Sequence, residues 1–193
     1  LDLLCDELGC DIIKIASADL TNLRFLRYAA GKGLPIVLST GMADLPEIDE
    51  ALEALQEAGA EEIILLHCVS WYPSEFEIIN LRAMHTLRDR YGLPVGYSDH
   101  SLGTTLPAAA VAMGARMIEK HYTLDPTAFG PDHKASLSPD ELVEMIQRIR
   151  EVEQALGTGA KGPGDILEIE LSQRRVHRRS VVTKVPVAKG AVF

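Results

Sequence analysis

A repeated alternation of helix-closing glycines and β-like runs is the feature that most constrains the fold of this chain. The glycines recur at intervals of 22 to 33 residues: Gly9, Gly33, Gly59, Gly92 and Gly114. Glycine adopts the left-handed backbone conformation that often ends a helix, so each one predicts a helix before it and a strand after it. Runs rich in Ile, Val and Leu follow, and we expect them to form a parallel sheet: residues 11–17, 35–40, 62–68, 94–98 and 117–122.

Two helix starts can be read from the sequence. Asp44 and Ser138 are each followed three residues later by a glutamate, with a proline in the first turn, and this is the pattern of a capping box. Apolar side chains then recur at helical spacing after Ser138. We expect them to form one buried face of that helix: Leu142, Val143, Ile146, Ile149 and Val152.

Two architectures accept such alternation, an open doubly wound sheet and a (β/α)8 TIM barrel. An open sheet gathers its ligand groups at one switch point, whereas a barrel brings every strand end to one mouth. Here all five expected strands end in polar or titratable side chains, which favours the barrel. Five units cannot close an eight-stranded barrel, and the chain begins with Leu1 rather than Met. We therefore expect a fragment that holds about the last five βα units.

The composition is typical of a cytoplasmic globular protein. The chain has 193 residues, 47% of them hydrophobic, and no apolar run approaches the length of a membrane span. A net charge of −9 argues against nucleic acid or an anionic membrane as a partner, because both require a broad positive surface. The cysteines lack the paired spacing of zinc or disulfide sites, so we expect three free thiols: Cys5, Cys10 and Cys68.

Two histidines at neighbouring strand ends indicate a metal site. His100 ends the run 96–100 and His121 ends the run 119–121, and each has an acidic neighbour. Neutral imidazoles are common metal ligands, and two of them on adjacent strands leave coordination positions open for substrate. Open positions are typical of catalytic metal sites rather than structural ones.

The other strand-end residues give weaker indications. We expect His67 to be a structural residue at the barrel rim and Cys68 to be a buried small hydrophobe rather than a nucleophile. Lys120 alternates out of phase with Glu119 and His121. It therefore points either toward the helix layer or, if the strand end twists, toward the ligand.

Motifs at every expected strand end resemble those of the N-acetylneuraminate (sialic acid) synthase family. They extend over nearly the whole chain, at residues 14–22, 38–42, 65–73, 96–100, 119–125 and 130–136. The tail 178–182, with Lys189 and Gly190 further on, resembles the linker and first strand of the family's C-terminal antifreeze-like (SAF) domain. The resemblance implies three parts: residues 1–157 as a partial barrel domain, 158–178 as a linker and 179–193 as the incomplete start of the SAF domain.

The resemblance implies an enzyme that condenses phosphoenolpyruvate with an open-chain N-acylated mannosamine-type sugar. The products are phosphate and a nonulosonic acid of the sialic, legionaminic or pseudaminic type. In the family, histidines matching His100 and His121 bind a divalent metal, usually Mn²⁺ or Mg²⁺, which polarises the sugar aldehyde. The family positions that hold phosphoenolpyruvate match four residues here: Lys14, Ser17, Ser39 and Ser98.

The resemblance also assigns residues to the sugar. Asp132 matches an acid that exchanges a proton with the new hydroxyl group. Asp19 stands where many members have a glutamate that contacts the sugar, and Tyr72 is expected to bind substrate from the loop 67–73. In relatives the SAF domain of one subunit covers the barrel mouth of another, so a homodimer is implied.

Two other functions remain open from the residues alone. One is a metal-dependent isomerase or aldolase that acts on a sugar phosphate, and the other is a non-catalytic sugar-binding barrel. The acceptor sugar is also open among N-acetylmannosamine, a di-N-acetylated 6-deoxy sugar of the legionaminic type and a pseudaminic-type precursor.

Overall fold

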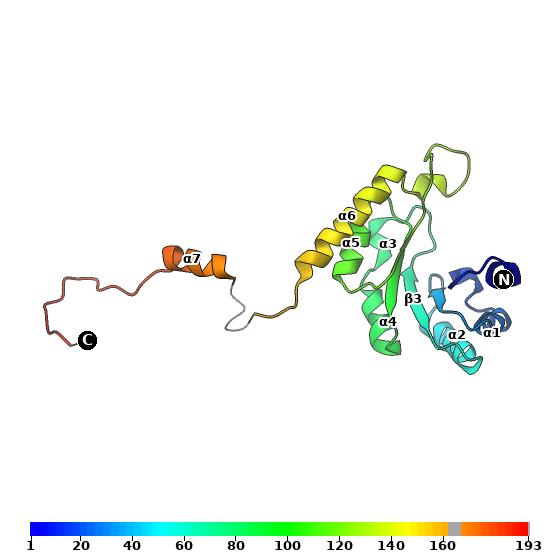
Figure 1. Ribbon diagram of the computed structural model, residues 1–193, viewed down its shortest axis with the longest axis horizontal. Coiled ribbons are helices and arrows are strands. Elements are labelled where there is room, and N and C mark those ends of the chain that lie inside the picture. The colour runs from blue at the N-terminus through cyan, green and yellow to red at the C-terminus, as the bar shows by residue number, and fades with distance from the viewer. Residues whose placement is uncertain (162–166, 193) are drawn as a thin grey trace. The chain divides into compact units, whose positions relative to one another are not determined.

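The computed structural model describes residues 1–161 and 167–192, and the chain divides into two compact units, Leu1–Leu156 and Gly157–Phe193. The first unit is built on five parallel strands that follow one another across the sheet in chain order (Figure 1). A doubly wound sheet would reverse its strand order at a switch point, so the chain order confirms the barrel prediction. The strands are β1 (Ile13–Ile15), β2 (Ile36–Ser39), β3 (Ile63–Cys68), β4 (Val95–Asp99) and β5 (Ile118–Lys120).

Helices cover one face of this sheet (Figure 1). Apolar side chains of the strands and of α1, α2, α4 and α5 form one continuous buried core, while α1 packs against α2 and α5 packs against α6. The α-helices of this unit are α1 (Leu23–Ala30), α2 (Leu45–Glu57), α3 (Phe76–Ile79), α4 (Ala83–Tyr91), α5 (Thr105–Ala112) and α6 (Pro139–Leu156). Three short helices of other types are η1 (Leu3–Glu7), η2 (Ser17–Asp19) and η3 (His133–Ala135).

The strand register separates the apolar core from a polar face. Paired residues of neighbouring strands point to the same side of a sheet, and Lys14 pairs with Val37, Cys68 with Ser98 and Ser98 with Glu119. The residues that alternate with them contribute to the core under the helices. Lys14, Ser39, Ser98 and Glu119 therefore share the face that the helices leave uncovered.

The sheet is strongly curved, and its polar face is the concave one. Lys14 lies on β1 and Glu119 on β5, the two outermost strands, yet Lys14 Nζ is 3.4 Å from Glu119 Oε2. A flat sheet would separate its first and fifth strands by roughly 19 Å. This curvature is the one that a (β/α)8 barrel requires.

Both predicted capping boxes are present. At the start of α2, Glu47 N donates to Asp44 Oδ1 and Asp44 N donates to Glu47 Oε2, each at 3.0 Å. At the start of α6, Ser138 N donates to Glu141 Oε2 at 2.8 Å, and Glu141 N donates to Ser138 Oγ at 3.4 Å. These bonds satisfy backbone donors that a helix start leaves unpaired.

The predicted buried face of α6 is partly wrong. Met145 is buried and Leu142 and Ile149 are half-buried, but Val143 and Ile146 remain 66% and 47% exposed. Since α6 packs against α5, a single neighbouring helix covers a narrow stripe rather than the broad face that the sequence pattern suggested.

The second unit contains helix α7 (Glu168–His177), and the described residues that follow it, 178–192, form no strand. The expected linker, 158–178, thus includes a helix. Residues 162–166 of that linker and residue 193 of the expected SAF segment lie outside the described residues. The assignment of 179–193 to a SAF domain stays a prediction.

Across the described part of the chain, every helix is too short or too polar to span a lipid bilayer.

Candidate active site

The two predicted metal ligands lie next to each other at the carboxyl ends of β4 and β5. His100 directly follows the last residue of β4, and His121 directly follows the last residue of β5. Their ring centroids are 5.4 Å apart, with the rings nearly edge to face. Neighbouring parallel strands that end at the same level of the sheet bring these side chains together.

His100 is oriented so that one ring nitrogen remains available. Its Nδ1 lies 2.7 Å from the carbonyl oxygen of Val69, and because a carbonyl can only accept, Nδ1 carries the proton. Burial lowers the pKa of His100, which favours the neutral ring with a lone pair on Nε2. A second ring nitrogen fixed by a backbone carbonyl is the usual arrangement for a metal-binding histidine.

Tyr72 covers both histidines from the loop after β3. Its ring centroid is 4.1 Å from that of His100 and 5.6 Å from that of His121. Burial raises the pKa of Tyr72, and the negative charges of groups that include Asp132 and Glu119 add to this effect. The phenol therefore stays protonated and can donate a hydrogen bond to a ligand beside the histidines.

A chain of polar contacts crosses the concave face toward the histidines. Lys14 Nζ is 3.4 Å from Glu119 Oε2, and Ser98 Oγ donates to Glu119 Oε1 at 2.7 Å. Ser98 Oγ is also 3.3 Å from His100 Nε2. The predicted donor-binding residues Lys14 and Ser98 thus lie beside the predicted metal ligands.

The other two predicted serines lie at the carboxyl ends of β1 and β2, just after β1 for Ser17 and within β2 for Ser39. Ser17 Oγ is 3.1 Å from Ser70 Oγ, so it contacts the loop that carries Tyr72. Ser39 is the last residue of β2 and is only 3% exposed, and it lies close enough to Cys68 to lower the pKa of that thiol.

The two predicted acids lie at the rim. Asp19 is exposed in η2, and Asp132 is exposed just before η3. Within residues 1–161 and 167–192, neither carboxylate is hydrogen-bonded to another predicted site residue. Asp132 is nevertheless close enough to raise the pKa of Tyr72.

Lys120, whose direction the sequence left open, and His67, which was expected to be structural, both lie on the helix-covered face. Lys120 Nζ is 2.7 Å from Asp99 Oδ2, so Lys120 points away from His121. His67 Nε2 donates to the carbonyl oxygen of Ile79 at 2.7 Å, and burial lowers the pKa of this ring. These contacts match the structural reading of His67.

Glu119, which joins Lys14 to Ser98, was assigned no role from its sequence position. Strand alternation carried the signal, because Glu119 lies two residues before His121 and therefore on the same face. What the sequence did not show is the curvature that brings β1 within reach of β5.

The donor set fits a divalent cation that keeps water or substrate among its ligands. In the part of the chain that the structure describes, no three His, Cys, Asp or Glu side chains group as a metal-binding set. Two imidazoles would be the protein ligands that this part of the chain supplies, and other coordination positions would be open to water or substrate. His100 and His121 are the residues that could hold such an ion.

Residues 1–161 match the NeuB family over their whole length. The chain belongs to the NeuB family. The matched stretch contains every site residue described above, from Lys14 to Asp132.

Two curated relatives of this NeuB chain are named N,N'-diacetyllegionaminic acid synthase. The one from Legionella pneumophila is 44% identical over 189 residues, which cover 96% of this chain and 52% of the relative. The one from Campylobacter jejuni is 47% identical over 192 residues, which cover 98% of this chain and 57% of the relative. The chain thus spans about half the length of these curated relatives.

A solved structure shares the fold of this NeuB chain. It is N-acetylneuraminic acid (sialic acid) synthetase from Leptospira borgpetersenii in complex with citrate, with a TM-score of 0.79 and 41% sequence identity. The match covers 91% of this chain and 61% of that one.

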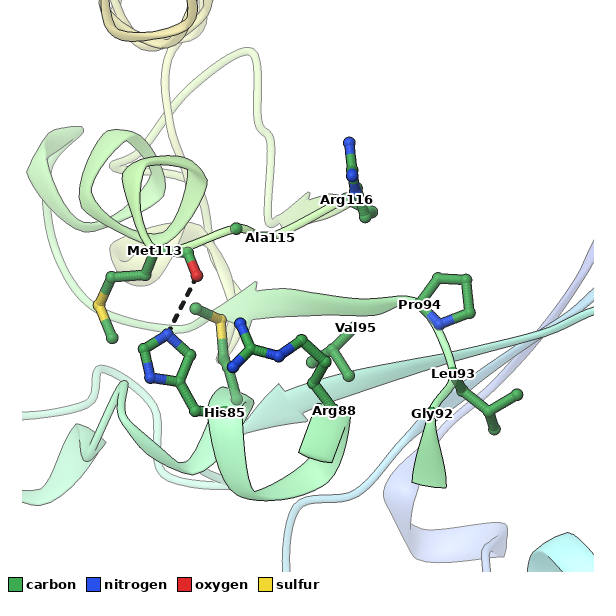
Figure 2. Close-up of a pocket in the computed structure, with 11 residues that line it drawn as sticks. His85, Arg88, Gly92, Leu93, Pro94, Val95, Met113, Ala115 and Arg116 are labelled. Carbon is green, nitrogen blue, oxygen red and sulfur yellow. Dashed lines mark hydrogen bonds between the residues drawn. The ribbon is translucent and has the colours of Figure 1, made fainter. Parts of the chain in front are cut away.

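A separate hollow of about 530 Å³ lies at the opposite end of the sheet in this NeuB chain (Figure 2). It is lined by α4, the turn before β4 and the turn before β5, and His85 Nε2 donates to the carbonyl oxygen of Met113 at 3.1 Å. Its polar side chains are His85, Arg88 and Arg116, and its lining includes no predicted site residue. Residues at this end of a barrel generally serve stability rather than catalysis.

Proposed function

We propose that this NeuB-family protein condenses phosphoenolpyruvate with an N-acylated mannosamine-type sugar to give a nonulosonic acid and phosphate. Relatives that are 44% and 47% identical to it over 189 and 192 aligned residues are named N,N'-diacetyllegionaminic acid synthase. The observation that carries the proposal is the position of the histidine pair beside the Lys14, Glu119 and Ser98 chain on the concave face.

Lys14, Ser17, Ser39 and Ser98 would bind the donor. Phosphoenolpyruvate carries a phosphate and a carboxylate, which require positive charge and hydrogen-bond donors at short range. The ammonium group of Lys14 and the hydroxyl group of Ser98 now both contact Glu119. A bound donor would take over these contacts of Lys14 and Ser98 with Glu119.

His100 and His121 would hold a divalent cation, Mn²⁺ or Mg²⁺, at the acceptor. When bound, such an ion supplies electrophilic activation of a carbonyl oxygen. Tyr72 covers the same position and keeps a protonated hydroxyl group there. This group can orient the sugar and exclude water from one side of it.

The reaction forms one carbon–carbon bond and releases one phosphate. The C3 carbon of phosphoenolpyruvate attacks the aldehyde carbon of the sugar, and the aldehyde oxygen takes up a proton as it becomes a hydroxyl group. Asp132 is the residue that would exchange this proton, and Asp19 would bind the sugar from the rim. Water then adds at C2, and phosphate leaves with cleavage of its C–O bond.

A homodimer is the proposed assembly, supported by the family resemblance of the tail to a SAF domain that covers a partner's barrel mouth. Light scattering on the full-length gene product tests it, and a monomer would contradict it.

The function is tested by phosphate release from phosphoenolpyruvate and Mn²⁺ with the full-length gene product. Three acceptors are compared with a no-sugar control: N-acetylmannosamine, the legionaminic-type sugar and the pseudaminic-type sugar. We expect release that depends on one of them. His100→Ala and His121→Ala should each lower the rate about 1,000-fold, because an activating cation contributes several kcal/mol. His85→Ala, at the opposite end of the sheet, is the matched control and should retain the parent rate.

Folded, metal-loaded protein that releases no phosphate with any sugar would overturn this function. Turnover of a sugar phosphate without phosphoenolpyruvate would then indicate an isomerase or aldolase. Saturable sugar binding without turnover would indicate a binding protein.

A further inference from the structure

At the ends of β4 and β5, consecutive residues point to opposite faces of the sheet. Asp99 and Lys120 are register partners on these strands, and their side chains meet on the helix-covered face with 2.7 Å between Nζ and Oδ2. His100 and His121 follow them directly and bring their rings together on the concave face. Each proposed metal ligand is therefore one peptide unit from a member of the same ion pair.

This ion pair differs from the others in its burial. Its side chains are 3% and 0% exposed for Lys120 and Asp99. Every other ion pair among the described residues has one partner that is at least 38% exposed. The difference sets Asp99 and Lys120 apart from the surface pairs, which are screened by solvent.

Hydrogen bonds satisfy both buried charges. Asp99 Oδ1 accepts from Tyr97 Oη at 3.0 Å, from Ser101 N at 2.8 Å and from Ser101 Oγ at 2.7 Å. Lys120 Nζ donates to Asp99 Oδ2 and to the carbonyl oxygen of Ser101. The network thus ties the end of β5 to the residues on both sides of His100.

Stability alone is a weak reason for such a pair. Removing two charges from water costs several kcal/mol for each ion, and well-packed apolar residues often replace a buried ion pair without loss. Directional bonds between two strand ends instead fix the position of one strand relative to the other. At this place in the fold, that position sets the separation of the two histidine rings.

We propose that Asp99 and Lys120 are positioning residues, which hold His100 and His121 at the separation needed to bind a divalent cation. The inference rests on the proposed function, because that function supplies the role of the cation. Outer-shell groups that orient metal ligands commonly change metal affinity by about 10-fold to 100-fold when they are replaced.

The test compares two double variants of the full-length gene product. Asp99→Asn with Lys120→Met removes both charges of the buried pair at once, so no charge is left buried and unpaired. Asp49→Asn with Arg90→Met removes an exposed ion pair between α2 and α4 and is the matched control. Mn²⁺ affinity is measured from the electron paramagnetic resonance signal of free Mn²⁺, and thermal unfolding of the metal-free proteins reports folding.

We expect the buried-pair variant to fold and to bind Mn²⁺ about 10-fold to 100-fold more weakly than the parent, while the control keeps the parent affinity. A folded buried-pair variant with the parent affinity would overturn the inference. If that variant does not fold, Tyr97→Phe tests the inference instead, because it removes one hydrogen bond to Asp99 without changing any charge. Its affinity should fall about fivefold, and an unchanged affinity would overturn the inference.

The same experiment separates this inference from the proposed function. A parent protein that binds Mn²⁺ and releases no phosphate would overturn the function, while the affinities of the variants would still decide the role of the pair. A parent protein that does not bind Mn²⁺ would overturn both.

Discussion

Cys68 lies among polar groups on the concave face, yet its surroundings keep it unreactive. The side chain is 5% exposed, and burial raises the pKa of its thiol despite the hydrogen bond from Gly41 N, the nearby hydroxyl group of Ser39 and the positive charge of Lys14. The thiolate is the reactive form of cysteine. At neutral pH this residue is therefore a small apolar side chain that accepts a bond from Gly41 N.

Iodoacetamide should modify Cys10 in the native protein and leave Cys68 unmodified, because Cys10 is exposed and Cys68 is buried. Mass spectrometry of peptides after a short reaction at pH 7.5 measures this, and unfolded protein is the control in which both cysteines react. Rapid modification of Cys68 in folded protein would contradict the prediction and would return it to consideration as a nucleophile.

The residues of the candidate site were predicted unequally well. The proximity of His100 and His121 could be predicted because polar side chains at adjacent strand ends meet whatever the curvature of the sheet, while their role as metal ligands stays a prediction. The link between Lys14 and Glu119 could not, since it joins the first and fifth strands and depends on that curvature. Contacts between neighbouring strands can be predicted from the local sequence pattern. Contacts across the barrel depend on the curvature of the whole sheet.

The strands β4 and β5 approach closely beside Gly96. A Cβ atom added to Gly96 would lie 2.6 Å from Leu66 Cδ2 and 3.0 Å from Met117 Cβ, and still closer to the carbonyl oxygen of Met117. That oxygen accepts the bond from Tyr97 N at 2.9 Å that joins the two strands. Glycine at this position is therefore what allows β5 to lie against β4.

Gly96→Ala should lower the free energy of unfolding by about 2 kcal/mol, because the added methyl group overpacks a backbone contact that cannot move freely. Gly31→Ala is the matched control, since its Cβ would meet nothing closer than Tyr28 O at 3.4 Å. Urea unfolding of both variants measures the difference. Equal stability of the two variants would show that β5 can move away from β4 at little cost.

At the scale of elements, the strands were easier to predict than the helix faces. Each predicted strand overlaps an observed one because apolar runs between glycines and polar ends are typical of buried parallel strands. The exposed side chains of Val143 and Ile146 on α6 were wrongly predicted as buried. A helical pattern predicts which face of a helix is apolar, but it does not predict how many neighbouring elements cover that face.

At the scale of the molecule, the described sheet has two edges. β1 pairs with β2 and β5 pairs with β4, so each outer strand presents one row of unpaired backbone groups. Such edges favour pairing with another chain. Exposed apolar side chains such as Ile12, beside β1, add to this tendency.

A protein consisting of these 193 residues alone should self-associate and lack phosphate-releasing activity. Ile12→Lys should reduce the association, because a charged side chain beside an edge strand opposes strand pairing. Ile169→Lys, in α7, is the matched control and should leave it unchanged. Light scattering over a range of protein concentrations measures association. An active monomer would contradict the prediction.

The alternation of faces at the ends of β4 and β5 also restricts how chain length can change during evolution. Insertion of one residue within β4 would turn Asp99 toward the concave face and His100 into the helix layer, and a deletion would do the same. Two residues would restore the faces but move the ligands along the strand. Length variation among homologous chains should therefore accumulate in the turns near Gly92 and Gly114. The number of residues in β4 and β5 should stay constant, because their side chains alternate between the two faces of the sheet.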